Sequence, residues 1–186
     1  QIRFGEILSV SDEAGSRAVG IICLIGFLMG VIIAFETALV AQIFGAVIFV
    51  VNGIGIAMTR ELGPLMTAIL FAGRSGSAFA AQLGTQKVNE ELNALTTFGL
   101  SPMYFLVVPR LIASSLVVPL LSVFATILGI LGGGLVMAMY DITYTQFYVQ
   151  LLKSVTVTDI VFGLVKAVIF GFVIALIGCQ CGMNTG

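Results

Sequence analysis

The sequence predicts an all-α protein that crosses a membrane several times, and three observations favour this fold class. Of its 186 residues, 59% are apolar and only 9% are charged, whereas soluble domains carry roughly 25% charged residues. The mean hydropathy is +1.17. Apolar runs long enough to cross a hydrocarbon core of about 30 Å recur along the chain. None alternates as a β-barrel strand would, so we expect a single membrane domain over residues 1–186, built from helices.

The same composition excludes several classes of function. The chain has no His and three Cys, so a His-based catalytic triad, a metal site and a disulfide framework are not expected. A formal net charge of -1 does not favour nucleic-acid binding. No phosphate-binding loop of the form GxxxxGKS or GxxxxGKT occurs in the sequence. We therefore expect no cofactor and no catalytic residue in this chain, and any ATP and Mg to bind to another subunit.

The first half of the chain is expected to form two spans joined by an elbow. The first span covers about 18–36, is free of charge until its end, and closes at Glu36. Residues about 38–60 are also apolar, and we expect an elbow there, shared between the end of the first helix and the entry to the second. The second span covers 61–84, which meets the required length of about 20 residues although it contains Arg74.

Two further spans follow, separated by an outer loop. The third covers about 104–139 and is longer than one perpendicular span. The outer loop comprises residues 141–159, and the last span covers about 160–178 with Lys166 inside it. Counting the elbow as a span would give five, and we favour four.

The distribution of Lys and Arg next to the spans predicts the orientation in the membrane. Most of these residues flank the N-terminal segment and the 84–104 loop, and they are Arg3, Arg17, Lys87 and Arg110. We therefore expect both segments in the cytoplasm and the 141–159 loop outside.

A short amphipathic helix is expected within the cytoplasmic loop, over about 88–98. Val88, Leu92 and Leu95 recur at i, i+4 and i+7, which places them on one helix face. Gly99 suits the position just past a helix end. The opposite face carries Glu90 and Glu91, whereas helices that rest on lipid headgroups usually carry Lys and Arg. Both an interfacial helix and a helix docked on a soluble partner remain open from these residues.

Small residues form a row along the second span, spaced four apart: Ala68, Ala72, Gly76, Ala80 and Gly84. A parallel row comprises Gly73, Ser77 and Ala81. Such rows let helix backbones approach closely in lipid. Packing within one bundle and a seam between two copies are both compatible with this pattern.

Ionisable residues within or next to the spans are costly there and face a cavity or a partner. They are Glu36, Glu61, Arg74 and Lys166. Internal charge pairing, for example between Glu61 and Arg74, and a polar cavity that contacts a substrate headgroup are the two interpretations.

Dense motifs between residues 60 and 110 resemble the MlaE-type permease family. They include Arg60-Glu61-Leu62-Gly63-Pro64, the stretch 71–78 and the stretch 83–95. Members of this family are the membrane subunits of ABC transporters that move phospholipids or related lipids in bacterial envelopes, mycobacteria and plastids. The resemblance covers essentially the whole chain. Gln1 is not an initiator Met, and the resemblance implies a further segment before it and one more span after Gly186.

The resemblance implies several partners and a location. A second permease copy would complete a homodimer in the bacterial inner membrane, and an MCE-domain lipid-binding protein would lie on the outer face. A cytoplasmic ABC ATPase subunit, with ATP and Mg, would hold the 88–98 coupling helix. Coupling would involve Lys87, Val88, Glu90, Glu91, Leu92, Leu95 and Phe98. The chain departs from the family pattern at four positions. Glu36 stands where Gln is expected, and Gln82 stands where Glu is usual. Gln86 replaces a Met, and Glu91 replaces a Gln.

We therefore predict a permease subunit that moves a phospholipid-like amphiphile. Its acyl chains would contact Leu65, Ile69, Phe71 and Phe79, and its polar end would face Glu36, Glu61 and Arg74. The alternatives are an ion-coupled secondary transporter or channel, which should show inverted repeats that this sequence lacks, and a membrane scaffold that transports nothing. A membrane-embedded enzyme is disfavoured because no paired nucleophile and base occurs.

Overall fold

The computed structural model describes residues 4–184, and it is helical with no β-strand among these residues. Four helical stretches are long and apolar enough to cross a membrane: Ala18–Ile43, Phe49–Val88, Phe105–Ala138 and Val157–Met183. The predicted all-α polytopic fold class is therefore confirmed. Arg3 and the side chain of Arg17, two residues on which the predicted orientation rests, lie outside the described part of the structure.

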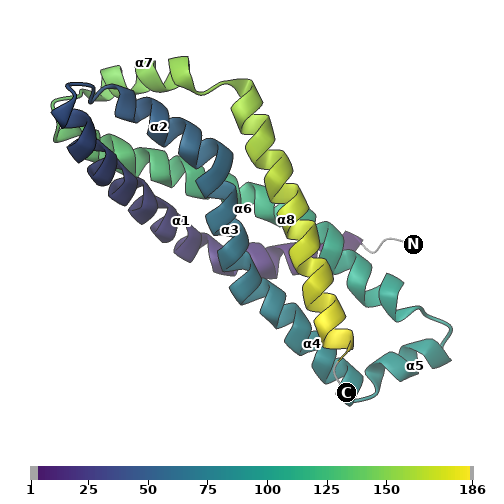
Figure 1. Ribbon diagram of the computed structural model, residues 1–186. Helices are drawn as coiled ribbons and strands as arrows, with labels where there is room; N and C mark the ends of the chain where they lie inside the picture. Colours follow the sequence, from purple (N-terminus) through teal and green to yellow (C-terminus); the bar gives the residue numbers. More distant parts are fainter. Residues whose placement is uncertain (1–3, 185–186) are drawn as a thin grey trace. The chain divides into compact units, whose positions relative to one another are not determined.

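The elements follow one another along the chain as drawn in Figure 1. The α-helices are α1 (Phe4–Ile43), α2 (Phe49–Ala57), α3 (Gly63–Phe71), α4 (Ser77–Val88), α5 (Glu91–Thr97), α6 (Val108–Ala138), α7 (Tyr144–Ser154) and α8 (Val157–Met183). Three π-helical turns join some of them: η1 (Met58–Leu62), η2 (Ala72–Gly76) and η3 (Met103–Val107).

The predicted elbow over 38–60 contains the turn between the first two spans, but most of this stretch is helical. Helix α1 continues past Glu36 to Ile43, and the hydroxyl of Thr37 donates back to the carbonyl of Ile33 at 2.6 Å. The chain turns at Gly45, whose φ of +66° lies in the left-handed region that glycine adopts without a steric cost. No charge or proline interrupts the apolar residues on either side of this turn, so both sides remain helical.

The second span passes Pro64 without ending, although proline removes a backbone donor and normally breaks a helix interior. The π-helical turn η1 lies directly before it, and the N–H of Gly63 bonds to the carbonyl of Met58, five residues back. The hydroxyl of Thr126 also donates to that carbonyl, at 3.2 Å. A π-turn shifts the register of the helix bonds, so the proline is accommodated and the Arg60-Glu61 pair lies inside the span.

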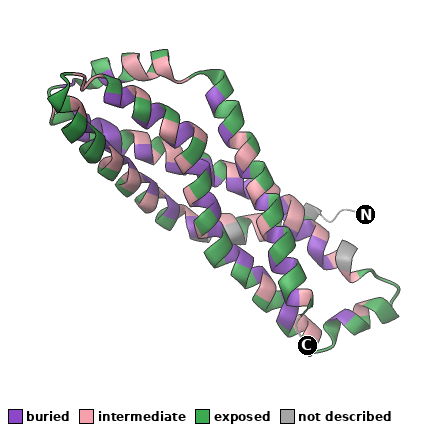
Figure 2. Ribbon diagram, in the orientation of Figure 1, coloured by how far each residue is buried: buried purple, intermediate pink, exposed green. Residues whose placement is uncertain are grey.

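The described residues form two compact units. Unit 1 comprises those within Gln1–Ala18, Ala68–Pro119 and Ala167–Gly186, and unit 2 comprises Val19–Thr67 and Leu120–Lys166. Helices α1, α3, α6 and α8 contribute residues to both units. Buried and exposed residues alternate along the long helices (Figure 2), and many large apolar side chains are exposed, as expected where helices face lipid. The single membrane domain remains a prediction.

In unit 2, glycines allow α1 to pack directly on α6. A Cβ atom added to Gly26 would lie 2.9 Å from the Cα atom of Ala125, and one added to Gly30 would lie 2.7 Å from the Cα atom of Gly129. The GxxxG motif of the first span is therefore used for packing within the chain. Unit 2 also contains an apolar core, formed by Ala34, Ala38, Val50, Val51, Ile54, Met58, Val136, Met137, Ile142 and Phe147.

In unit 1, part of the predicted small-residue row packs against α8. A Cβ atom on Gly178 would lie 2.6 Å from the carbonyl oxygen of Gly76, and one on Gly182 would lie 2.6 Å from that of Ala80. Packing within the bundle is therefore the use of these positions. Ala68 and Gly84 are buried, whereas Ala72 and the parallel row at 73, 77 and 81 are exposed.

The predicted outer loop 141–159 contains a helix that the sequence analysis did not identify. Helix α7 begins after Thr143, whose hydroxyl accepts from the N–H of Gln146 at 3.2 Å, while the Gln146 side chain accepts from the N–H of Thr143 at 3.1 Å. This capping box satisfies two otherwise unpaired donors. Helix α7 runs beside α2 in unit 2 (Figure 1) and is tied to it by a 2.6 Å hydrogen bond from Gln150 to Asn52.

Candidate functional site

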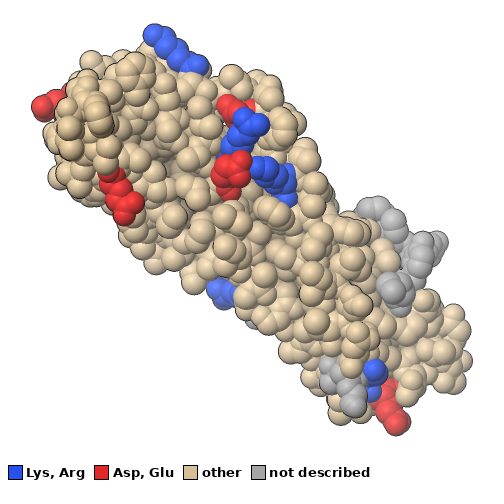
Figure 3. Space-filling model, viewed as in Figure 1, with Lys and Arg blue, Asp and Glu red and all other residues tan. Residues whose placement is uncertain are grey.

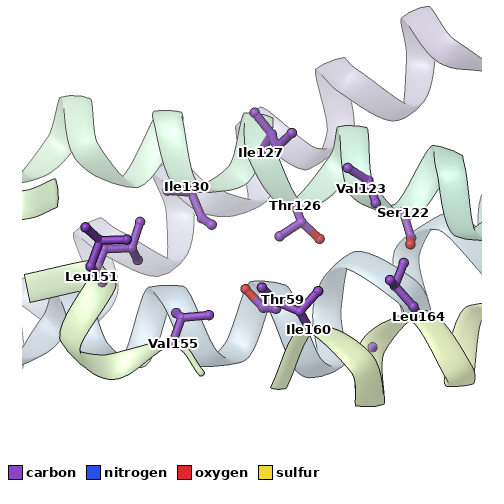
Figure 4. Close-up of a pocket in the computed structure, with 12 residues that line it drawn as sticks. Thr59, Ser122, Val123, Thr126, Ile127, Ile130, Leu151, Val155, Ile160 and Leu164 are labelled. Atoms are coloured by element: carbon purple, nitrogen blue, oxygen red, sulfur yellow. The ribbon is translucent and has the colours of Figure 1, made fainter. Parts of the chain in front are cut away.

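An apolar pocket with a volume of about 300 Å³ lies in unit 2. Its walls come from η1, α6, α7 and the first turns of α8, and the lining residues are Thr59, Ser122, Val123, Thr126, Ile127, Ile130, Leu151, Leu152, Val155, Ile160, Gly163 and Leu164. Figure 4 shows Thr126 and Ile130 of α6 pointing toward Val155 and Ile160 on the other side. The only polar side chains that line it carry hydroxyl groups, so the pocket suits an apolar ligand with few polar atoms.

An ion pair joins the segments that form one wall of this pocket. The guanidinium of Arg60 donates to Oδ1 of Asp159 at 3.2 Å. It also lies over the ring of Phe162, 4.6 Å from the centroid, a geometry that stabilises a cation. Thr59 and Ile160, which line the pocket, are the chain neighbours of this pair. A charged site therefore adjoins an apolar one.

Asp159 has a second role at the start of α8, where it forms a capping box with Thr156, the residue before the helix. Its Oδ2 atom accepts from the backbone N–H and from the hydroxyl of Thr156, both at 3.2 Å. The Thr156 hydroxyl in turn is within 3.4 Å of the N–H of Asp159. The carboxylate is buried, so the cap and the ion pair together hold its charge in place.

A second ion pair joins Glu61, the residue after Arg60 on η1, to Lys166 of α8. The ammonium of Lys166 donates to Oε1 of Glu61 at 2.7 Å, with the two side chains 34% and 60% exposed. On the face drawn in Figure 3, acidic and basic side chains lie together amid a largely uncharged surface. The sequence analysis considered Arg74 as the partner of Glu61, and the structure gives Lys166 that role. Internal pairing is thus observed for two of the ionisable residues within the spans.

The seven residues predicted for the lipid pathway do not line the pocket. In unit 2, Leu65 is 44% exposed, and Glu36 and Glu61 are exposed. In unit 1, Ile69 is 54% exposed and Arg74 is exposed on η2. Phe71 and Phe79 are buried in unit 1, where their rings meet edge to face at 6.3 Å.

Two functional candidates were missed by the sequence analysis for different reasons. Asp159 was assigned to the end of a loop, although the spacing Thr156-x-x-Asp159 before an apolar run is the signal of a helix start. Arg110 was used only for orientation. It is buried in unit 1, where it donates to the carbonyl of Leu106 at 2.8 Å and to the side chain of Gln82 at 3.1 Å. No sequence signal separates a buried arginine near a span end from one that faces the headgroups.

The predicted coupling helix 88–98 is shorter than expected. Val88 ends α4 and is 67% exposed, and Glu90 adopts a left-handed φ of 62° that separates α4 from α5. The stripe of Val88, Leu92 and Leu95 on one continuous helix is therefore wrong. Leu92 is buried, and Gly99 follows the helix end with a φ of +78°, as predicted.

The segments on the two sides of α5 differ in their contacts with the rest of unit 1. Lys87 donates to the carbonyl of Met183 at 2.6 Å, which ties the end of α4 to the end of α8 in unit 1. Glu90 and Glu91 are exposed, and Phe98 is 81% exposed. Exposed aromatic residues such as Phe98 are enriched at contact surfaces for other proteins.

Residues 7–186 match the family described as Permease MlaE. The chain belongs to this family. A probable ABC transporter permease protein of Rickettsia typhi is 32% identical over 92% of this chain and 67% of its own length. Another from a Synechocystis strain is 34% identical over 96% of this chain and 68% of its own length. The chloroplast protein trigalactosyldiacylglycerol 1 of Arabidopsis thaliana is 30% identical over the whole chain, which covers 53% of that protein.

Membership in the MlaE family makes the chain a permease of an ABC transporter. Such a permease works together with an ATPase partner. The four membrane-length stretches agree with a multi-pass membrane protein.

Proposed function

We propose that this MlaE-family chain moves phospholipid-like amphiphiles between membranes, as one half of a homodimer driven by a separate ATPase that binds ATP and Mg. Two comparisons support a lipid as the cargo: the family, and the Arabidopsis relative whose name contains a glycolipid. In this proposal the chain itself carries out no chemical reaction. Its role is to bind the cargo in one shape of the site and release it in another.

The observation that carries the proposal is the apolar pocket beside two ion pairs within membrane-length helices. Its volume of about 300 Å³ is at the lower end of the range of about 300–1,000 Å³ for small-molecule sites. One end of an acyl chain fits such a space better than a whole lipid does. A lipid would place this chain end among Ile127, Ile130 and Leu164, and its headgroup near the charged residues.

The two ion pairs suit a headgroup that carries both signs of charge. Arg60 and Lys166 supply donors for a phosphate, and Asp159 and Glu61 supply acceptors for an ammonium or hydroxyl group. Charged side chains in a membrane span are costly unless they are paired or face a polar cavity. In this proposal the charged side chains pair with one another when no cargo is bound. When cargo is bound, they pair with its headgroup instead.

The remaining elements of the proposal concern partners and orientation. The exposed surface of α5, with Glu90, Glu91 and Phe98, would bind the ATPase in the cytoplasm. Helix α7 lies in the 141–159 segment, which the distribution of Lys and Arg predicts to be outside, and it would face an MCE-domain lipid-binding protein. The location would be the inner membrane of a bacterium, with the N-terminal segment in the cytoplasm.

A substitution that fills the pocket tests the proposal directly. Ile127→Trp places a large ring in the pocket, whereas Leu131→Trp, one turn further along α6 and also exposed, adds the same ring outside it. With permease and ATPase reconstituted in vesicles, transfer of a fluorescent phospholipid should fall about tenfold or more for Ile127→Trp and stay near that of the wild type for Leu131→Trp. Equal transfer by both variants would contradict the role given to the pocket.

A further inference from the structure

A second pocket lies beside α5 in unit 1, with a volume of about 240 Å³. The end of α4, α5 and the start of the third span form its walls, and Gln86, Glu91, Leu95, Phe98 and Phe105 are among the lining residues. Small-molecule sites have volumes of about 300–1,000 Å³. The pocket is therefore too small for a nucleotide or a lipid, and it has the size expected for one inserted side chain.

The polar side chains that line this pocket are Gln86 and Glu91. Glu91 is exposed, and its carboxylate accepts hydrogen bonds and does not donate. A carboxylate that lines a small pocket favours a ligand with hydrogen-bond donors and a positive charge.

The rest of the lining is apolar and partly aromatic. Leu95 and Phe98 provide a surface on which the methylene stem of a long basic side chain packs. The ring of Phe98, which is 81% exposed, also attracts a cation placed over its face. A guanidinium group satisfies these requirements together, because its planar fork of donors matches a carboxylate and its flat face stacks on aromatic rings.

The geometry points to an arginine side chain of the ATPase partner as the occupant of this pocket. This inference deepens the proposed function, on which it rests, since it requires that α5 binds the ATPase. The arginine inserts between Phe98 and Leu95, and its guanidinium donates to the carboxylate of Glu91. The pocket thereby gives the contact a defined register, in addition to the general attraction between acidic and basic surfaces.

Two charge reversals distinguish binding in the pocket from the general electrostatic attraction of the loop. Glu91→Lys changes a lining residue, whereas Glu90→Lys makes the same charge change at the preceding residue, which is exposed and does not line the pocket. The Kd for the purified ATPase is measured by interferometry with the permease in nanodiscs. We expect Glu91→Lys to weaken binding about tenfold or more and Glu90→Lys by less than about threefold.

A rescue experiment identifies the partner side chain. In the Glu91→Lys background, the surface arginines and lysines of the ATPase are changed to Glu one at a time, and a change at one arginine should restore binding. A photoreactive benzoylphenylalanine in place of Phe98 should cross-link to the same ATPase segment. Equal effects of the two reversals, rescue only through a lysine, or a cross-linked segment without the rescuing arginine would each overturn the assignment.

The outcomes also separate this inference from the proposed function. If the wild-type permease does not bind the ATPase at all, docking through α5 fails and the pocket assignment fails with it. If the wild type binds and both reversals weaken binding equally, docking stands and only the arginine pocket is lost. If each variant unfolds at the same temperature as the wild type, its weaker binding does not arise from misfolding.

Discussion

Asp159 binds Arg60 through one carboxylate oxygen and caps α8 through the other. The Arg60–Asp159 contact measures 3.2 Å, and the side chain of Asp159 is only 10% exposed while that of Arg60 is 39% exposed. The residues are 99 positions apart in sequence. One carboxylate thus fixes both the start of α8 and its attachment to the π-helical turn of the second span.

This double role predicts graded losses of stability. Asp159→Asn removes the charge but keeps an oxygen for the cap, and we expect a loss of about 1–2 kcal/mol, because Arg60 is partly exposed and screened. Asp159→Ala also removes the cap and should cost about 1 kcal/mol more. Unfolding of the protein in nanodiscs would measure both. As a control, Asp141→Asn should be neutral, since Asp141 has a φ of 67° that Asn tolerates. A neutral Asp159→Asn would show that the ion pair contributes nothing.

The pair of Glu61 and Lys166 predicts non-additive effects. Glu61→Gln leaves an unpaired cation in the span, and Lys166→Met leaves an unpaired anion, so each single variant should be less stable than the wild type. The double variant removes both charges and should recover part of the loss. Since the side chains are 60% and 34% exposed, the coupling energy should be about 0.5–1 kcal/mol. A double-mutant cycle from thermal unfolding measures it, and losses that simply add would exclude an energetic link between the two.

Close packing of α1 on α6 predicts different responses from two glycines of the same helix. At Gly30 a Cβ atom would lie 2.7 Å from the Cα atom of Gly129, whereas at Gly20 it would meet nothing within 4 Å. Gly30→Ala forces two backbones apart and should cost about 1–3 kcal/mol. Gly20→Ala should be neutral or stabilising by about 0.5–1 kcal/mol, because alanine favours the helix. Equal unfolding temperatures for the two variants would contradict the packing described for unit 2.

Much of this fold follows from the sequence, because the length of an apolar run and the polar residues at its ends are local features. The apolar runs predict the spans, and Gly99 predicts the end of the helix in the cytoplasmic loop. The extent of helix within the elbow was not predictable, because Arg60 and Glu61 interrupt the apolar run and Pro64 is a helix-breaking signal. Within the span, their costs are offset by distant residues: Asp159, Lys166 and the hydroxyl of Thr126.

The candidate site was harder to predict from the sequence, because it also depends on residues that are far apart in the chain. The sequence identified Glu61 and Lys166 as costly charges in a span, but their pairing depends on which helices meet. The lining of the pocket consists of ordinary aliphatic residues such as Ile127 and Val155, which differ in no local pattern from residues that face lipid. Helix α7, by contrast, was predictable from Thr143 and Gln146, whose spacing is that of a capping box.

Arg74 provides the prediction that best separates transport from a purely structural role. Its side chain is exposed on η2, and within the described residues of unit 1 no hydrogen bond or ion pair holds its guanidinium. Arg74→Ala therefore removes no contact of the folded chain, and we expect the free energy of unfolding to change by less than about 0.5 kcal/mol. A charge that is kept in a membrane span without a structural partner is explained by a function, so phospholipid transfer should fall at least about tenfold. Arg74→Lys keeps the charge and should retain part of the activity. A variant that unfolds like the wild type, assembles with the ATPase and still transfers lipid at the full rate would remove Arg74 from the pathway and leave the scaffold alternative in its place.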